Sequence, residues 1–85
     1  MKTKIQKLPK WFTGTHYTNG ETVTNPFSEE SYELNNLELS MYDFIMGAQM
    51  MLDMGLNDKS ILTDFHKGLD WFRTNNAEGY RILLD

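Results

Sequence analysis

Apolar residues in the second half of the chain recur every three or four positions, a spacing that predicts helices. The first predicted helix spans residues 41–54, because Ser40 is placed to cap its start and Gly55 to end it. Leu39 and Phe44 stand at the positions of a hydrophobic staple around that cap. The pattern predicts a central helix that is apolar on more than one side.

A second helix is predicted after a short break and runs to about Thr74, with Asn57 as its N-cap and Leu56 and Ile61 as its staple. Asn76 can then cap a short third helix, Ala77–Leu84. The core stripe predicted for the second helix has close to ideal helical spacing and consists of Ile61, Leu62, Phe65, Leu69 and Phe72.

Residues 14–34 are rich in β-branched and aromatic side chains, which are typical of strands. Thr15–Thr18 and Glu21–Thr24 flank Asn19-Gly20, a dipeptide that tolerates positive φ at both central positions of a type I′ turn. These residues predict a hairpin, and Ser31–Leu34 is a candidate third strand. The predicted fold class is therefore α+β: an N-terminal β-hairpin, with that candidate strand, packed on two main α-helices plus a short C-terminal helix.

The length of 85 residues indicates a single domain, 1–85, with a basic arm (1–12), a β region (13–35) and a helical region (40–85). The chain has no cysteine, which excludes disulfides, zinc-thiolate sites and cysteine nucleophiles. A secreted domain of this size usually needs such cross-links, and the arm lacks the apolar run of a signal peptide. No stretch approaches the roughly 20 apolar residues of a membrane span. We therefore expect a cytoplasmic protein without membrane contact.

Charge is distributed unevenly along the chain. The first ten residues contain four basic side chains and no acidic one, whereas all 12 acidic residues lie from Glu21 onward, with four basic residues among them. Such an arm can contact an anionic partner, or it can dock on its own acidic body or be solvated. Four lysines without arginine make a weak site for phosphates, so nucleic acid is the less favoured partner. The arm lysines are Lys2, Lys4, Lys7 and Lys10.

Two features of the helices are candidates for an interface. Met46, Met50 and Met54 form a second apolar stripe on the first helix, spaced by four residues. Either the hairpin covers this stripe, or the flexible thioethers meet a partner. Trp71 lies off the core stripe of the second helix, so it either packs under the arm or sits at an interface.

Residues that could carry chemistry do not form a known motif. His66 and Asp70 are one helical turn apart, but the sequence offers no convincing third metal ligand. It also has no HExxH motif and no glycine-rich phosphate loop. Nothing places Ser28 or Ser31 beside a histidine. We therefore predict no catalytic, cofactor-binding or metal-binding residues and expect the protein not to be an enzyme.

Three stretches resemble short uncharacterised proteins encoded by tailed phages of marine cyanobacteria. The first stretch, residues 20–34, reads GETVTNPFSEESYEL, and the second, residues 38–47, reads ELSMYDFIMG. The third is Lys67-Gly68-Leu69 with Trp71-Phe72-Arg73. The chain differs from that pattern at Glu29, where we expect glycine. The resemblance implies an accessory protein in the host bacterial cytoplasm and carries over no functional residue.

These observations lead to two expectations about function. The leading one is a small non-enzymatic protein-interaction or accessory module that binds protein, in the first place a second copy of itself as a homodimer. The alternative is a nucleic-acid-associated accessory protein that uses the lysine arm. The two differ in their response to salt, because phosphate contacts weaken steeply as the salt concentration rises.

Overall fold

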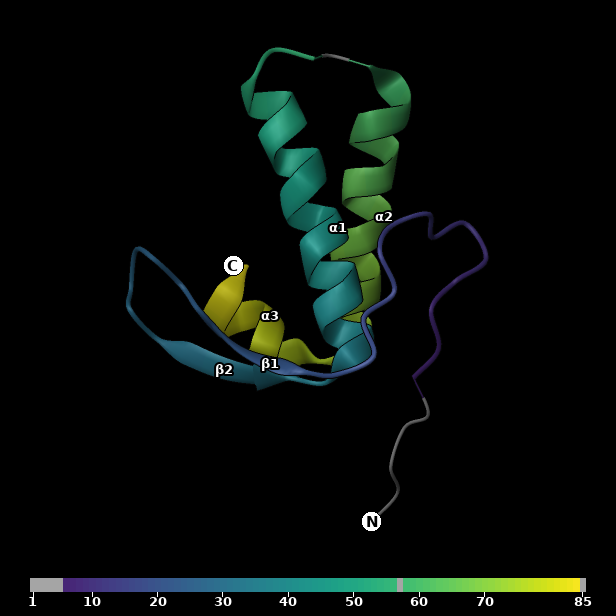
Figure 1. Ribbon diagram of the computed structural model, residues 1–85. Coiled ribbons are helices and arrows are strands. Elements are labelled where there is room, and N and C mark those ends of the chain that lie inside the picture. Colours follow the sequence, from purple (N-terminus) through teal and green to yellow (C-terminus); the bar gives the residue numbers. More distant parts are fainter. Residues whose placement is uncertain (1–5, 57, 85) are drawn as a thin grey trace.

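The computed structural model describes residues 6–56 and 58–84 and confirms the α+β class. Two strands, β1 (Glu21–Thr24) and β2 (Ser31–Leu34), precede three helices, α1 (Asn36–Asp53), α2 (Lys59–Asn75) and α3 (Ala77–Leu83). Figure 1 shows α1 and α2 side by side as an upright helical hairpin, with the strands and α3 lying across its base. The N-terminal arm runs along the other side of α2.

The core lies where the helical hairpin of α1 and α2 meets the strands and α3. Met41 and Ile45 of α1 and Phe72 of α2 are almost fully buried. A Cβ atom added at Gly68 would lie 2.8 Å from Cγ1 of Ile45, so the glycine allows the close approach of the two helices. The predicted core stripe of α2 is wrong at Leu62, which is 46% exposed. Leu62 points in nearly the same direction around the helix as Leu69, which packs on the core, but it lies near the start of α2, at the end of the helical pair away from the strands and α3.

The β-hairpin joins different segments of the chain from those predicted. β1 pairs antiparallel with β2, so that Glu21 lies opposite Leu34 and Thr24 opposite Ser31. Ser31–Leu34 is thus a strand as predicted, whereas the predicted strand Thr15–Thr18 is wrong. In the described part of the chain, positive φ occurs at Glu29 and Gly55, so Asn19-Gly20 does not form a type I′ turn.

Glycine is needed at position 20 because of a close backbone contact and not because of a turn. A Cβ atom added there would lie 2.1 Å from the carbonyl oxygen of Leu34, so only glycine lets the chain enter β1 beside the end of β2. The connection between the strands is organised by Asn25, whose side chain accepts a hydrogen bond from the backbone N–H of Phe27. Glu29, where the phage resemblance leads us to expect glycine, has a φ of 65°, in the left-handed region that favours glycine.

α1 begins five residues earlier than predicted. Its N-cap is Asn35, which forms a capping box with Glu38, and Ser40 is therefore not the cap. Ser40 is fully buried inside the helix, where its hydroxyl donates to the carbonyl oxygen of Asn36 and accepts from the N–H of Tyr17. The sequence allows a helix start at Asn35 or at Ser40. The start at Asn35 is selected because it also places Leu34 and Leu39 in the core.

The end of α1 agrees with the prediction. The N–H of Gly55, with φ at 89°, donates to the carbonyl oxygen of Leu52, and the N–H of Leu56 donates to that of Met51. This pair of hydrogen bonds is a Schellman motif, in which glycine accepts the left-handed conformation without steric cost.

The caps of the other two helices are close to those predicted. Asp58 caps α2; the predicted cap, Asn57, lies outside the described residues. Hydrogen bonds from the backbone N–H and the hydroxyl of Ser60 lower the pKa of the Asp58 carboxyl group. The cap therefore contributes its full stability at pH values above the ordinary pKa of the carboxyl group. This stability is lost as the pH falls through the lowered pKa. Asn76 caps α3 as predicted, and α3 ends one residue earlier, at Leu83. Within residues 6–56 and 58–84, no helix combines the length and the apolar character needed to cross a bilayer.

The packing of α2 leads to a first prediction. Phe72 is fully buried, so Phe72→Ala should lower the free energy of unfolding by about 3–5 kcal/mol. Phe65 is only partly buried, and Phe65→Ala should cost clearly less, about 1–3 kcal/mol. Urea denaturation of both variants measures the difference. Equal losses would contradict the packing of α2 described above.

A second prediction compares two glycines. Gly20→Ala should destabilise the fold by at least about 1 kcal/mol, because the added methyl group collides with the backbone of β2. Gly47→Ala is the matched control, since nothing lies within 4 Å of a Cβ added at that helical position. It should stabilise the protein by about 0.5–1 kcal/mol. Thermal unfolding of the two variants should therefore shift in opposite directions.

Candidate functional site

The methionine stripe (Met46, Met50 and Met54) is exposed along α1. The exposed fractions of these residues are 40%, 62% and 70%. The stripe lies on the side of α1 opposite Met41 and Ile45. The strands lie at the base of the helical hairpin formed by α1 and α2. The alternative in which the strands cover the stripe is therefore wrong. Apolar exposure of this extent on one helix face is the feature expected of an interface.

Neighbouring side chains extend the apolar surface around the methionine stripe. Met51 is 39% exposed and Leu56 is 47% exposed. One edge of the stripe is polar, since Nε2 of Gln49 donates to a carboxylate oxygen of Asp53 at 3.0 Å. The three methionines contain no charged or hydrogen-bonding group, and the exposed Asp43, one turn before Met46 on the same face, ends the apolar surface.

The N-terminal arm docks on the body through backbone and aromatic contacts. The indole N–H of Trp71 donates to the carbonyl oxygen of Lys7 at 3.0 Å, which places Trp71 under the arm. Phe12 is 7% exposed and packs against Phe44 with 5.1 Å between ring centroids. Of the two alternatives left open for the arm, these contacts favour docking on the chain's own body.

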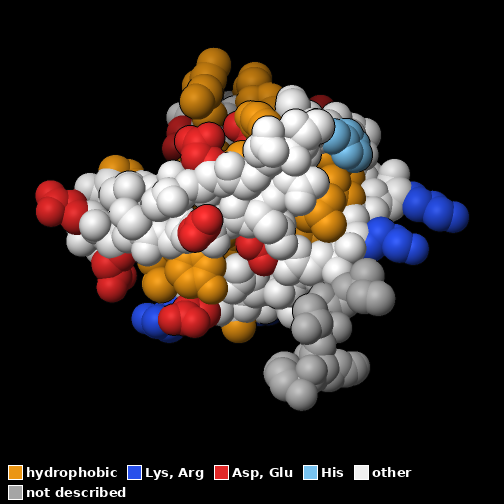
Figure 2. All heavy atoms as spheres, turned by 60° about the horizontal axis from the view of Figure 1, so that its bottom comes forward, with side chains coloured by type: hydrophobic (Ala, Val, Ile, Leu, Met, Phe, Trp, Pro, Cys, Tyr) orange, Lys and Arg blue, Asp and Glu red, His pale blue; other side chains and the backbone are white. Residues whose placement is uncertain are grey.

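The two described lysines of the arm, Lys7 and Lys10, form no ion pair that would hold the arm on the body. Lys7 and Lys10 are exposed, and Lys2 and Lys4 lie outside the described residues. Among the described residues the ion pairs join Arg73 to Asp70 and Arg81 to Glu78, not the arm to the body. In Figure 2 acidic side chains spread over the body, while basic ones stand out at the right edge and at the lower left. The ammonium groups of Lys7 and Lys10 therefore stay available to an anion.

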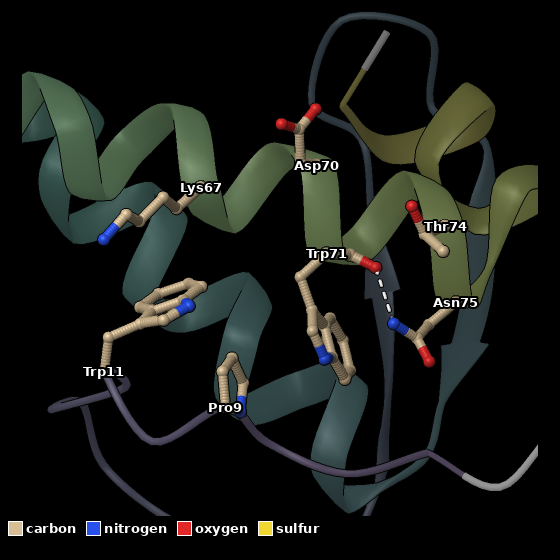
Figure 3. Close-up of a pocket in the computed structure, with 7 residues that line it drawn as sticks. All are labelled: Pro9, Trp11, Lys67, Asp70, Trp71, Thr74 and Asn75. Atoms are coloured by element: carbon tan, nitrogen blue, oxygen red, sulfur yellow. Dashed lines mark hydrogen bonds between the residues drawn. The ribbon is translucent and has the colours of Figure 1, made fainter.

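A hollow of about 390 Å³ lies between the arm and α2. We call it the tryptophan hollow, and Figure 3 shows the side chains around it. The ammonium group of Lys67 lies over the ring of Trp11, 5.4 Å from the ring centroid, a cation–π arrangement. The hollow is lined by Pro9, Trp11, Lys67, Asp70, Trp71, Thr74 and Asn75.

A larger hollow, of about 600 Å³, lies beside β2 and the start of α1. Three of its polar residues are already bonded to one another: Glu38 accepts from the backbone N–H of Asn35 and from the side-chain amide of Asn76. Both asparagines are also helix caps. These groups hold the fold together and leave little capacity for a ligand.

The residues considered for chemistry are separated in the structure. Asp70 pairs with Arg73, not with His66, whose ring lies against Phe65. His16 packs edge-on against Phe12. Within residues 6–56 and 58–84 no three histidine, cysteine or carboxylate side chains gather into a group that could hold a metal ion.

One phenol is perturbed by its surroundings, although it lies outside the two surfaces described above. Partial burial raises the pKa of Tyr42, so its hydroxyl group stays protonated at neutral pH.

Sequence reasoning found Trp71 but missed the hollow around it. Lys67 and Trp71 share one side of α2, a relationship that helical spacing can show. Pro9 and Trp11 come from a segment about 60 residues earlier in the chain, and only the fold brings them to α2.

Comparison of the chain with protein-family models, curated proteins and solved structures found no match. The resemblance to phage proteins therefore stays a prediction, and the proposals below depend on the geometry alone.

The contact between Trp71 and the arm leads to a third prediction. Trp71→Phe keeps an aromatic ring but removes the hydrogen bond to the Lys7 carbonyl, a loss of about 0.5–1.5 kcal/mol of docking free energy. The arm should then detach more often, and trypsin should cleave after Lys7 and Lys10 about 2- to 10-fold faster. Met50→Leu, at an exposed position of α1 that leaves the arm and this hydrogen bond in place, is the control. Equal cleavage rates for the parent and Trp71→Phe would contradict docking through this bond.

Proposed function

We propose that the chain is a small non-enzymatic protein-interaction module that pairs with a second copy of itself through the methionine stripe. The observation that carries the proposal is the exposure of Met46, Met50 and Met54 along one face of α1, opposite the buried face of the same helix. A domain with a small core gains from covering such a face, because removal of apolar area from water stabilises the assembly.

A second copy suits this surface for two reasons. The stripe has no charge, so a two-fold contact between two stripes brings no like charges together at its centre. The thioether side chains also adapt to one another, which lets the same surface serve both partners. Trp71 has no part in this contact, because it is held under the arm.

The size of the contact sets the expected affinity. The stripe extends over nine residues, so its ends are eight steps apart, about 12 Å at a rise of 1.5 Å per residue. Specific interfaces bury at least about 1,200 Å², counted over both partners. Two stripes, each with Met51 and Leu56 beside it, would bury an area at or below this limit. We therefore expect a dissociation constant in the micromolar range and not a permanent dimer.

The fourth prediction tests self-pairing. Met50→Glu places a carboxylate at the middle of the stripe, where each copy would bury it against the other, so the dimer should dissociate. Because Met50 is 62% exposed, the monomer should keep its stability within about 0.5 kcal/mol. Sedimentation of the parent and the variant from about 10 to 500 µM measures the change, since weak pairing is expected in this range.

Thr63→Glu, at an exposed position of α2 outside the methionine stripe, is the matched control and should sediment like the parent. A parent that stays monomeric throughout this range would refute self-pairing. Equal association of the parent and Met50→Glu would show that another surface is responsible.

A further inference from the structure

The tryptophan hollow combines aromatic walls with positive charge. The rings of Trp11, Trp71 and Pro9 surround it, as Figure 3 shows. Lys67 lies at its edge, and Lys7 belongs to the segment that covers Trp71. This arrangement is absent from the linear sequence, in which these residues are spread over positions 7–71.

Most polar groups around the hollow already have partners. The indole N–H of Trp71 is bonded to the Lys7 carbonyl, and the side-chain N–H₂ of Asn75 is bonded to the Trp71 carbonyl. The carboxylate of Asp70 is paired with Arg73, which offsets its charge. The acceptor groups in the walls are thus largely satisfied or neutralised.

Two of the groups at the hollow are donors. Lys67 contacts the face of Trp11 and forms no ion pair with any described carboxylate. Figure 3 also shows the indole nitrogen of Trp11 on the edge of the ring that faces Trp71, inside the hollow. An ammonium group and an indole N–H both favour an anionic or strongly accepting group on the ligand.

We infer that the tryptophan hollow binds a planar aromatic group that carries an anionic group, the chemistry of a nucleotide. The base stacks on an indole, a contact worth about 1–3 kcal/mol per base. The phosphate is held by Lys67, the lysine that lines the hollow. The volume of about 390 Å³ is within the usual range for sites of small molecules.

This site is separate from the methionine stripe, so it goes beyond the proposed function. Because the arm has four lysines and no arginine, nucleic acid was the less favoured partner expected from the sequence. The fold changes that balance locally, because it adds Lys67 and Trp71 to the arm while Asp70 is neutralised by Arg73. Asp64, one turn before Lys67, lines a different groove, with Gly47 and Ile61.

The same chemistry has two sources, a free nucleotide and one unit of a single strand. Both tryptophans of the chain lie in the hollow, so tryptophan fluorescence, excited selectively over that of the four tyrosines, reports on this site. The fifth prediction is that thymidine monophosphate or a ten-residue oligothymidylate quenches this fluorescence in a saturable way. Quenching by the mononucleotide indicates a small-molecule site; quenching by the oligomer only indicates a strand, and either result supports the inference.

Salt and charge variants complete the test. With one phosphate contact at Lys67, the affinity for the oligomer should fall roughly 2.6-fold between about 50 and 200 mM salt. Lys67→Gln should weaken binding of either probe at least about threefold, whereas Lys59→Gln, at the exposed start of α2, should leave it unchanged. Circular dichroism checks that both variants are folded, which their exposed positions lead us to expect.

Absence of quenching by both probes at low salt would overturn the inference. It would also be overturned by equal weakening in Lys67→Gln and Lys59→Gln, because binding would then reflect overall charge and not the hollow. Neither result affects the test of self-pairing, which uses a different surface and a different measurement.

Discussion

The carboxylate of Glu38 joins parts of the chain that are far apart in sequence, and the base of the fold depends on it. It accepts hydrogen bonds from the side-chain amide of Gln6 at 2.7 Å, from the backbone N–H of Asn35 at 3.0 Å and from the side-chain amide of Asn76 at 3.0 Å. Glu38 is only 6% exposed, and a buried carboxylate needs such donors. One group therefore fixes the arm, the start of α1 and the start of α3 together.

This anchoring at the base explains where the two candidate surfaces arise. The strands and α3 gather around the start of α1, so the core forms there and the far end of the helical hairpin is left with one neighbour on each helix. Met50 and Met54 lie toward that far end and are exposed for this reason. The arm, held at Gln6, then runs along α2 and forms the tryptophan hollow with Trp71.

The two surfaces differ in the physics that each offers to a partner. The methionine stripe is uncharged and adaptable, so its attraction comes from removal of apolar area and changes little with salt. The tryptophan hollow combines aromatic rings with an ammonium group, so its attraction has an electrostatic part that salt weakens. Because α1 carries one surface and α2 with the arm carries the other, a single small domain can use both at once.

The sequence by itself determined the class of the fold, the three helices, the third-helix cap at Asn76, the stop at Gly55 and the apolar stripe at Met46, Met50 and Met54. These features depend on spacing within one helix or on a side chain that bonds to nearby backbone, and such relations are visible in a linear sequence. Only the tertiary structure decided that β1 pairs with β2, that Asn35 caps α1 in place of Ser40, that the stripe is exposed and that Pro9 and Trp11 meet α2. Local patterns allowed more than one answer at each of these places, and contacts between distant segments selected one, as the closeness of Gly20 to Leu34 and the bonds of Glu38 show.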